Sequence, residues 1–169
     1  TEDIKKMRRI VREGLEAGAV GFTTGRSDVH RTADGDWTPA SESSREELVG
    51  IAKAFDGLNH GVLQAVSDFD MERGSAKFDH EFDIVDAFAK AGGENHPTSI
   101  SLIQRDFEPG QWLKIIARVE RANAKGIKIF MQVAPRAIGV MVGLQCTFHP
   151  FMGFPSYKKI SHLFLEDRV

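Results

Sequence analysis

The sequence has a single cysteine, Cys146, among its 169 residues. One thiol cannot form a disulfide within the chain, and there is no CxxC pair for a redox or zinc motif. We therefore expect Cys146 to be a small buried apolar residue without a chemical role.

Long apolar runs and an excess of one charge are also missing. The longest uncharged apolar stretch, residues 137–146, is too short to span a bilayer, and the first residues lack the basic-then-apolar pattern of a signal peptide. Lys plus Arg number 22 against 24 Asp plus Glu, a net charge of -2, so the chain lacks the electrostatic footprint of nucleic-acid binding. We expect a soluble, cytoplasmic protein that binds neither membrane nor nucleic acid.

Local motifs for metal and nucleotide binding are absent as well. The six histidines show neither HxH nor HExxH spacing, and no GxGxxG, P-loop or GxSxG pattern occurs. The residues alone therefore predict no metal site and give nucleotide binding no support.

Strand-like and helix-like segments alternate along the chain. Residues 1–19, 44–58, 78–93 and 110–125 have helical periodicity, and residues 19–24, 60–66, 96–104 and 126–135 have strand composition. Ser43 is a plausible N-cap of the second helix, with Glu46 in capping-box position. This alternation predicts parallel strands joined by right-handed crossovers, hence an α/β sheet or part of a (β/α) barrel.

No linker divides the chain, so we expect a single α/β domain over residues 1–169. The alternation stops after Pro135, and residues 137–169 are expected to form an irregular apolar loop with short helices. Residues 25–41 form a loop too long for a plain connector, and its tight-turn signal at residues 33–36 predicts a small excursion.

Parallel α/β folds bind ligands at the carboxyl ends of their strands. Three expected strands carry a glutamine there, namely Gln64, Gln104 and Gln132. Buried amides must be hydrogen-bonded, so the three could form one polar cradle for a substrate, or each could cap only its own strand.

Four charged or titratable residues also follow strands. Arg26 and Arg136 could each clamp a substrate carboxylate, because the guanidinium presents a planar fork to two oxygens; the alternative is a surface salt bridge. Arg136 follows Pro135 between two apolar stretches, which indicates more than a solvated surface residue. His30 and Asp68 could transfer a proton or give one metal ligand each, or have ordinary polar loop roles.

Three parts of the chain carry a family resemblance: residues 16–54, beginning EAGAVGFTTGRSDVHR; residues 82–104, with FDIVDAFAKAGG and PTSISLIQ; and residues 129–151, IFMQVAPRAIGVMVGLQCTFHPF. Together they resemble the N-acyl-D-amino-acid deacylases, or D-aminoacylases, of the amidohydrolase superfamily. They are most similar to the longer members, which have an Ala-Pro-Arg segment.

The resemblance implies a metal-dependent hydrolase that cleaves the amide of an N-acylated D-amino acid on a (β/α)8 barrel. It implies zinc, which would polarise the amide and lower the pKa of a bound water, while an Asp moves the proton. Its small-molecule substrate would be an N-acyl amino acid. His30 and Asp68 would then be the catalytic candidates, and the substrate mouth would be lined by Arg26, Gln64, Gln104, Gln132 and Arg136.

The chain also departs from the family. It has no HxH, no final-strand Asp, and residues 64–68 and Gln104 stand where zinc-binding members have histidines. We therefore expect about half a barrel without a complete catalytic or zinc site, covered by a second copy in a homo-oligomer or by the remainder of a parent chain.

Two other classes remain open. A non-catalytic binding or scaffold module could keep the fold without the metal, as the missing histidines suggest. An aldolase-type barrel would need a lysine at a strand end for Schiff-base chemistry, and no expected strand ends on lysine.

Overall fold

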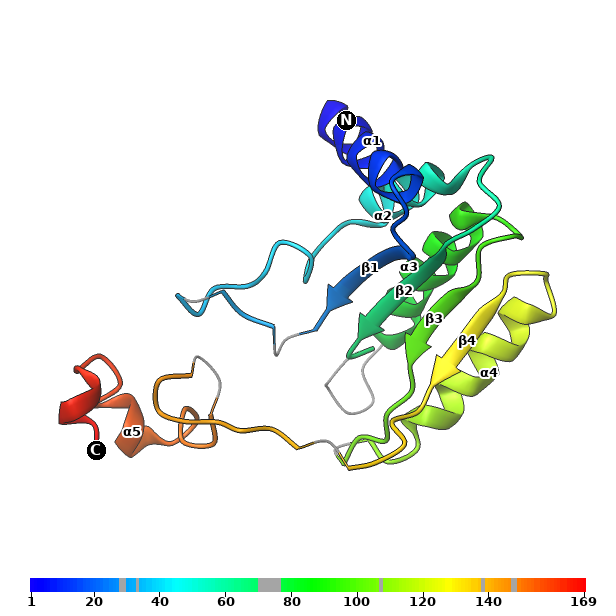
Figure 1. The fold of residues 1–169 in the computed structure, drawn as a ribbon. Helices are drawn as coiled ribbons and strands as arrows, with labels where there is room; N and C mark the ends of the chain where they lie inside the picture. The colour runs from blue at the N-terminus through cyan, green and yellow to red at the C-terminus, as the bar shows by residue number, and fades with distance from the viewer. Residues whose placement is uncertain (28–29, 33, 70–76, 107, 138, 147–148) are drawn as a thin grey trace.

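Helices and strands alternate along the chain in the computed structural model, which describes residues 1–27, 30–32, 34–69, 77–106, 108–137, 139–146 and 149–169 (Figure 1). The elements are α1 (Glu2–Glu16), β1 (Gly21–Arg26), α2 (Arg45–Ala52), the 3-10 helix η1 (Lys53–Phe55), β2 (Val62–Ser67), α3 (Lys77–Gly92), β3 (Thr98–Ser101), α4 (Gln111–Asn123), β4 (Ile129–Gln132), α5 (Pro155–Lys158) and the 3-10 helix η2 (Leu165–Asp167). The α/β alternation expected from the sequence is therefore confirmed.

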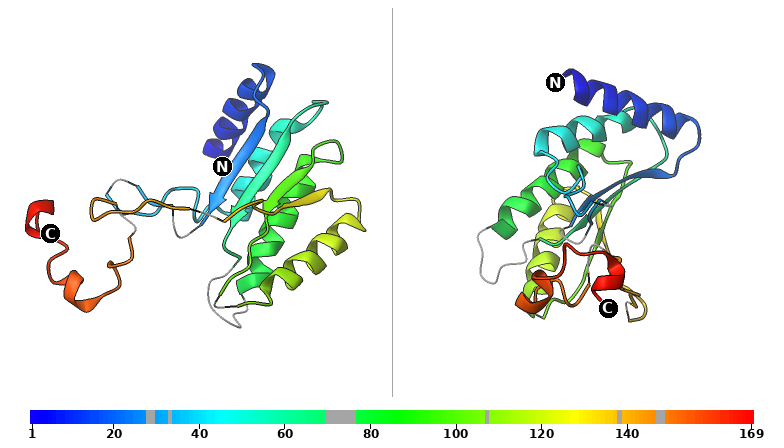
Figure 2. Two further views of the ribbon diagram at one scale, coloured as in Figure 1. Left: turned by 60° about the horizontal axis from the view of Figure 1, so that its bottom comes forward. Right: turned by 90° about the vertical axis from the view of Figure 1, so that its left-hand side faces the viewer.

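The four strands form one parallel sheet in the order β1-β2-β3-β4. Each strand pairs with the next one along the chain, and the connecting helices α2, α3 and α4 all lie on the same face of the sheet (Figures 1 and 2). Crossovers of one hand between successive neighbours place every helix on the same side. Among the described residues, no helix covers the other face of the sheet, which we call the helix-free face (Figure 2).

The core lies between the sheet and these helices. The sheet contributes Leu63, Ala65, Ile100 and Ile129, each at most 1% exposed. The helical side contributes a group of fully buried aromatic rings, namely Phe55, Phe82 and Phe88. Burial of each such side chain is worth roughly 1.5–3 kcal/mol, so this layer carries most of the stability.

Helices α3 and α4 are joined by one arginine. Arg118 of α4 donates to Asp79 at 2.8 Å, to Asp86 at 3.0 Å and to Asp83, and its guanidinium lies 4.9 Å from the ring centre of Phe82. Burial alone would lower the pKa of Arg118, but hydrogen bonds and charge from Asp83 and Asp86 outweigh this effect and raise the pKa. Arg118 therefore stays charged and fixes which side of α4 faces α3.

Hydroxyl caps start the first two helices. The Thr1 hydroxyl accepts from the Ile4 N–H at 3.3 Å, and the Ser44 hydroxyl accepts from the Glu47 N–H at 3.1 Å. The expectation that Ser43 is the cap is therefore wrong by one residue. Ser43 is buried, and its hydroxyl donates to the Ala40 carbonyl instead.

Strand boundaries differ from those expected. β1 begins two residues later and includes Arg26, while β3 and β4 end at Ser101 and Gln132, before residues 104 and 135. The Leu102 N–H still donates to the Gln132 carbonyl at 2.9 Å. The β4 ladder thus ends before Pro135, which has no N–H to continue it.

Gly21 allows the closest approach of β1 to β2. A Cβ added there would lie 2.0 Å from the Val62 carbonyl oxygen, a contact that only a backbone shift could relieve. We expect Gly21→Ala to destabilise the fold by about 1–3 kcal/mol in urea unfolding. Gly14 is the matched control, because nothing lies within 4 Å of its added Cβ and it is inside α1, so Gly14→Ala should stabilise by about 0.5–1 kcal/mol. Equal urea midpoints for Gly21→Ala and Gly14→Ala would contradict the close approach of β1 to β2 at Gly21.

The chain leaves the sheet after β4 and ends in a separate small cluster (Figure 1). Here the ring of buried His149 lies 4.7 Å from that of Tyr157, and Arg168 donates to the Tyr157 hydroxyl at 2.9 Å. Cys146 is exposed, so its expected burial is wrong, since the expected apolar packing does not form around it. Of the helices in the described residues, none has the length and apolar character needed to cross a membrane.

Candidate functional site

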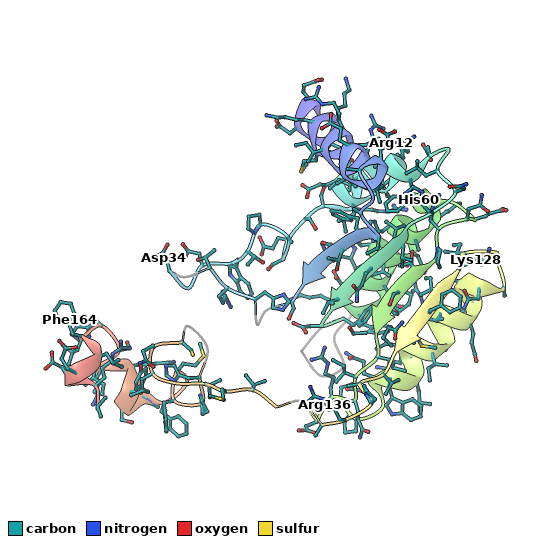
Figure 3. All side chains as sticks on the ribbon, in the orientation of Figure 1. Arg12, Asp34, His60, Lys128, Arg136 and Phe164 are labelled. Carbon is teal, nitrogen blue, oxygen red and sulfur yellow. The ribbon has the colours of Figure 1, made fainter. Side chains whose placement is uncertain are left out.

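The candidate site lies at the carboxyl edge of the sheet, where the four strands end. Figure 3 places Asp34 and Arg136 beyond this edge, and His60 and Lys128 at the opposite end of the strands. The His60 ring lies within 3.2 Å of the Leu15 carbonyl, which ties it to the end of α1. The site thus draws on the residues expected to follow β1, β2, β3 and β4.

The helix-free face of the sheet carries rows of mostly small and polar side chains, with Val66 and Phe130 as the apolar members. One row crosses the strands through Thr23, Gln64, Ser99 and Phe130. The next row toward the carboxyl edge runs through Gly25, Val66, Ser101 and Gln132. Because alternate residues of a strand share a face, these rows present hydroxyl and amide groups on the side opposite the core.

The structure places two of the three predicted glutamines on the same face of the sheet, on strands separated by β3. Gln64 and Gln132 lie on the helix-free face, in successive rows. Gln104 lies three residues beyond the end of β3 and is exposed, so the three-residue cradle does not form. The strand phasing also agrees with the sequence, since Ile129 is 1% exposed on the core side and Phe130 is 57% exposed on the other.

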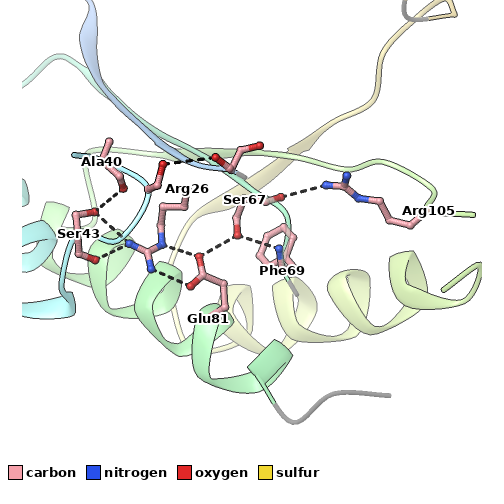
Figure 4. Close-up of polar contacts among 9 residues, drawn as sticks. Arg26, Ala40, Ser43, Ser67, Phe69, Glu81 and Arg105 are labelled. Atoms are coloured by element: carbon pink, nitrogen blue, oxygen red, sulfur yellow. Dashed lines mark hydrogen bonds and ion pairs between the residues drawn. The ribbon is translucent and has the colours of Figure 1, made fainter. Parts of the chain in front are cut away.

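Arg26 does not offer its fork to a ligand. Its Nε and Nη2 donate to the two carboxylate oxygens of Glu81 at 2.5 and 2.9 Å, and its Nη1 donates to the carbonyl and hydroxyl oxygens of Ser43 at 2.5 and 3.1 Å (Figure 4). The side chains of Arg26 and Glu81 are 8% and 17% exposed. The geometry corrects the predicted substrate clamp to an internal ion pair, because an internal carboxylate occupies both arms of the fork.

The same carboxylate holds the turn after β2. The Ser67 hydroxyl donates to Glu81 Oε1 at 2.9 Å and accepts from the Phe69 N–H at 3.0 Å (Figure 4). Phe69 has φ 53°, which is rare for a bulky residue, and its buried ring stacks on Phe82 at 5.3 Å. Glu81 therefore fixes the backbone on both sides of Asp68.

Asp68 lies at the carboxyl end of β2 beside a second arginine. Arg105 Nη2 donates to Asp68 Oδ1 at 3.1 Å and reaches the Ser67 carbonyl at 3.5 Å. The two side chains are 19% and 13% exposed, so the pair is reachable from solvent only in part. Proton transfer by Asp68 stays a prediction, with Arg105 now known to be its neighbour.

His30 is exposed and lies close to the helix-free face. A Cβ added to Gly25 would come within 3.0 Å of His30 Nδ1, and Gly25 belongs to the row that faces away from the core. The glycine leaves room for the imidazole near the carboxyl end of β1. Beyond it, the bridge between Arg31 and Trp37 forms the base of the small excursion expected in this loop.

Arg136 is exposed, and its Nη1 donates to the adjacent Ala137 carbonyl at 3.3 Å. The expectation that it is more than a solvated residue is therefore wrong for this structure, because the apolar residues on either side of it are themselves exposed. Its position beyond the carboxyl edge leaves the guanidinium accessible to a ligand (Figure 3).

The described residues do not fit a metal centre. Among them, no group of three or more His, Cys, Asp or Glu side chains is arranged to hold an ion. Gln64, inside β2, and Gln104, beyond β3, have amide side chains without the basic nitrogen with which histidine binds zinc. The implied zinc therefore finds no ligand set in the part of the chain that the structure describes.

Glu81 is a site residue that the sequence analysis missed, and Ser43 was considered there only as a helix cap. A signal for Glu81 was present, since it lies three residues after Phe78 and four before Val85 on the apolar stripe of α3. A carboxylate on a buried stripe requires a charged or hydrogen-bonding partner. The identity of that partner could not be read, because Arg26 is 55 residues away.

We compared the chain with protein-family models, with curated proteins and with solved structures, and none of the three comparisons gave a match. The resemblance to the deacylases therefore rests on the sequence segments alone. Membership of that family stays a prediction.

Proposed function

We propose that the sheet is half of a (β/α)8 barrel whose mouth is the carboxyl edge. The sequential strand order and the one-sided helices support this, because a barrel has the same order and carries its helices outside. The helix-free face would then be the barrel interior. The rows of side chains on that face would correspond to the layers that fill a barrel interior.

We further propose that the chain is a segment of a metal-dependent amidohydrolase of the N-acyl-D-amino-acid deacylase type, in which it lines the substrate mouth. The observation that carries this is the polar character of one side of the sheet: Gln64 and Gln132 lie on the helix-free face, His30 lies by Gly25 near the end of β1, and Arg136 lies beyond the carboxyl edge, where barrels bind substrates. A cytoplasmic location belongs to the same proposal.

An N-acyl amino acid presents a carboxylate and an amide. The accessible Arg136 guanidinium would bind the carboxylate, and the Gln132 and Gln64 amides would hydrogen-bond the acyl-amide group. In hydrolysis, water adds to the acyl carbon, the C–N bond breaks and the departing nitrogen takes a proton. His30 and Asp68 are two titratable groups near this edge that could hold or move that proton.

This chain is proposed to bind the substrate without completing the catalytic centre. When bound elsewhere in such an enzyme, zinc would polarise the amide, but the described residues here supply no ligand set for it. No step is therefore assigned to a metal on this chain.

Calorimetric titration with N-acetyl-D-leucine tests the proposal. Arg136→Ala should weaken binding by roughly 10- to 100-fold, because a charge-assisted hydrogen-bonded pair is lost. Arg136→Lys keeps the positive charge but loses the planar fork, so its affinity should lie between those of the wild type and Arg136→Ala. Lys159→Ala removes an exposed charge from the terminal segment and is the control, expected to bind as the wild type. Equal affinity of Arg136→Ala and wild type would remove the assignment.

A non-catalytic binding module is the second candidate, and it is favoured because the residues that the structure describes contain no cluster of metal ligands. It predicts the same binding, with no release of free D-leucine by the complete gene product after zinc is added. Amine release by the complete gene product, at a rate proportional to protein and lost on chelation, would favour the enzyme.

A further inference from the structure

Two loops at the amino edge of the sheet, where the strands begin, repeat one four-residue pattern. Residues 57–60 and 93–96 both read Gly-x-Asn-His, and each of these loops leads into a strand, β2 or β3. Both patterns begin with a glycine of positive φ, 76° at Gly57 and 86° at Gly93. Because β2 and β3 are neighbours in the sheet, the two loops lie side by side and form the walls of one cavity.

This cavity is separate from the candidate site at the carboxyl edge. It has a volume of about 360 Å³ and is lined by residues 55–59 and 92–96. A space of this size can hold a small organic ligand. Its walls belong to the loops before the two inner strands of the sheet, so the cavity does not depend on the unpaired edges of β1 and β4.

His96 gives the cavity a hydrogen-bond acceptor on a buried side chain. The residue is 4% exposed, and its ring packs edge-on against Phe55 with 5.1 Å between the ring centres. Its Nδ1 lies 3.4 Å from the Gly61 carbonyl oxygen, which can only accept, so Nδ1 of the neutral ring carries the proton. Nε2 is then an acceptor, and no described residue donates to it. A ligand in the cavity that carries an N–H or O–H donor would satisfy this nitrogen.

The charged side chains that line the cavity are carboxylates. Asp56 comes from one loop and Glu94 from the other, and the amides of Asn59 and Asn95 accompany them. Neither a lysine nor an arginine lines the cavity, since Arg12, which donates to the Asp56 backbone carbonyl at 2.6 Å, is not among the lining residues. The cavity therefore attracts cations and repels anions.

We propose that this cavity binds a small primary alkylammonium ion. The ammonium group carries a positive charge and three N–H donors, which fit His96 Nε2, an amide oxygen and a carboxylate, while the alkyl part would lie against Leu58. A bare metal ion fits less well, since no three His, Cys, Asp or Glu side chains of the described residues are arranged to hold one. The proposal does not depend on which substrate the carboxyl edge binds.

Titration of the ¹⁵N-labelled chain with n-butylammonium chloride tests the proposal by magnetic resonance. In the free protein, the signal of His96 Nε2 should be that of an unprotonated ring nitrogen. Butylammonium should shift this signal saturably, together with the backbone amide signals of Asn59 and Asn95. Tetramethylammonium has the charge but no N–H donor, so it should bind about three- to tenfold more weakly. Sodium chloride at the same ionic strength should give no saturable shift.

Charge-removing variants test the walls of the cavity. Glu94→Gln and Asp56→Asn change exposed residues and should each weaken butylammonium binding about two- to fivefold, as expected for the loss of an exposed ion pair. Asp106→Asn removes an exposed carboxylate beyond β3, at the other edge of the sheet, and should bind as the wild type. The proposal is overturned if His96 shows no saturable shift, if tetramethylammonium or sodium binds equally well, or if Asp106→Asn weakens binding as much as Glu94→Gln.

Discussion

Replacing Glu81 by alanine should lower the free energy of unfolding by about 3–5 kcal/mol, the usual cost of removing one partner of a buried ion pair. The change leaves the Arg26 guanidinium, 8% exposed, with no carboxylate, and takes an acceptor from the Ser67 hydroxyl. Urea unfolding followed by circular dichroism measures the loss. Glu81→Gln keeps the shape and one acceptor, so it should lie between the alanine variant and the wild type.

Asp79 provides the matched control on the same helix. Its side chain is 75% exposed and shares Arg118 with two other carboxylates, so Asp79→Ala should cost less than about 1 kcal/mol. If Glu81→Ala proved no more destabilising than Asp79→Ala, the ion pair would not hold the carboxyl edge together.

Replacing Phe82 by alanine should have a similar cost, about 3–5 kcal/mol, because the deletion leaves a cavity in the core. Phe82 is fully buried, its ring stacks on Phe69 at 5.3 Å and lies 6.0 Å from Phe78, and the Arg118 guanidinium lies 4.9 Å from its ring centre. The deletion would also remove the ring on which Phe69 stacks, and with it the contact that supports the rare positive φ of Phe69. Thermal or urea unfolding measures the effect.

Phe164→Ala is the control for this deletion. The ring of Phe164 is 77% exposed in the terminal segment, so its removal should change stability by less than about 0.5 kcal/mol. If Phe82→Ala changed the free energy of unfolding as little as Phe164→Ala does, the aromatic side chains between the sheet and the helices would not stabilise the fold.

The sequence predicts the architecture well because its signals are periodic and local. The apolar stripe of α3 and the alternation in β4 each follow from spacing within a few residues, and both appear as expected. Strand ends were placed too late at residues 104 and 135, because apolar composition continues after the ladder bonds stop. Amino-acid composition indicates which residues prefer to be buried, whereas the end of a strand is set by where hydrogen bonds to the neighbouring strand stop.

The candidate site was less predictable, since its contacts join distant segments. Arg26 was expected to face a ligand, but its partner Glu81 lies on a helix that begins beyond β2. Asp68 likewise pairs with Arg105, which follows the next strand. Arg136 was expected to be sheltered by apolar neighbours that the structure leaves exposed. The sequence shows that Arg26 and Asp68 lie at strand ends, but it does not show which oppositely charged residue each of them pairs with.

Titration of ¹⁵N-labelled protein with N-acetyl-D-leucine tests most directly whether the carboxyl edge binds an acylated D-amino acid. We expect saturable shifts of the backbone amide signals of Gln64, Gln132 and Arg136, with little response near His60 at the opposite end, and weaker shifts with the L enantiomer. Saturable shifts confined to residues around His60, or no shifts with either enantiomer, would contradict the proposed site.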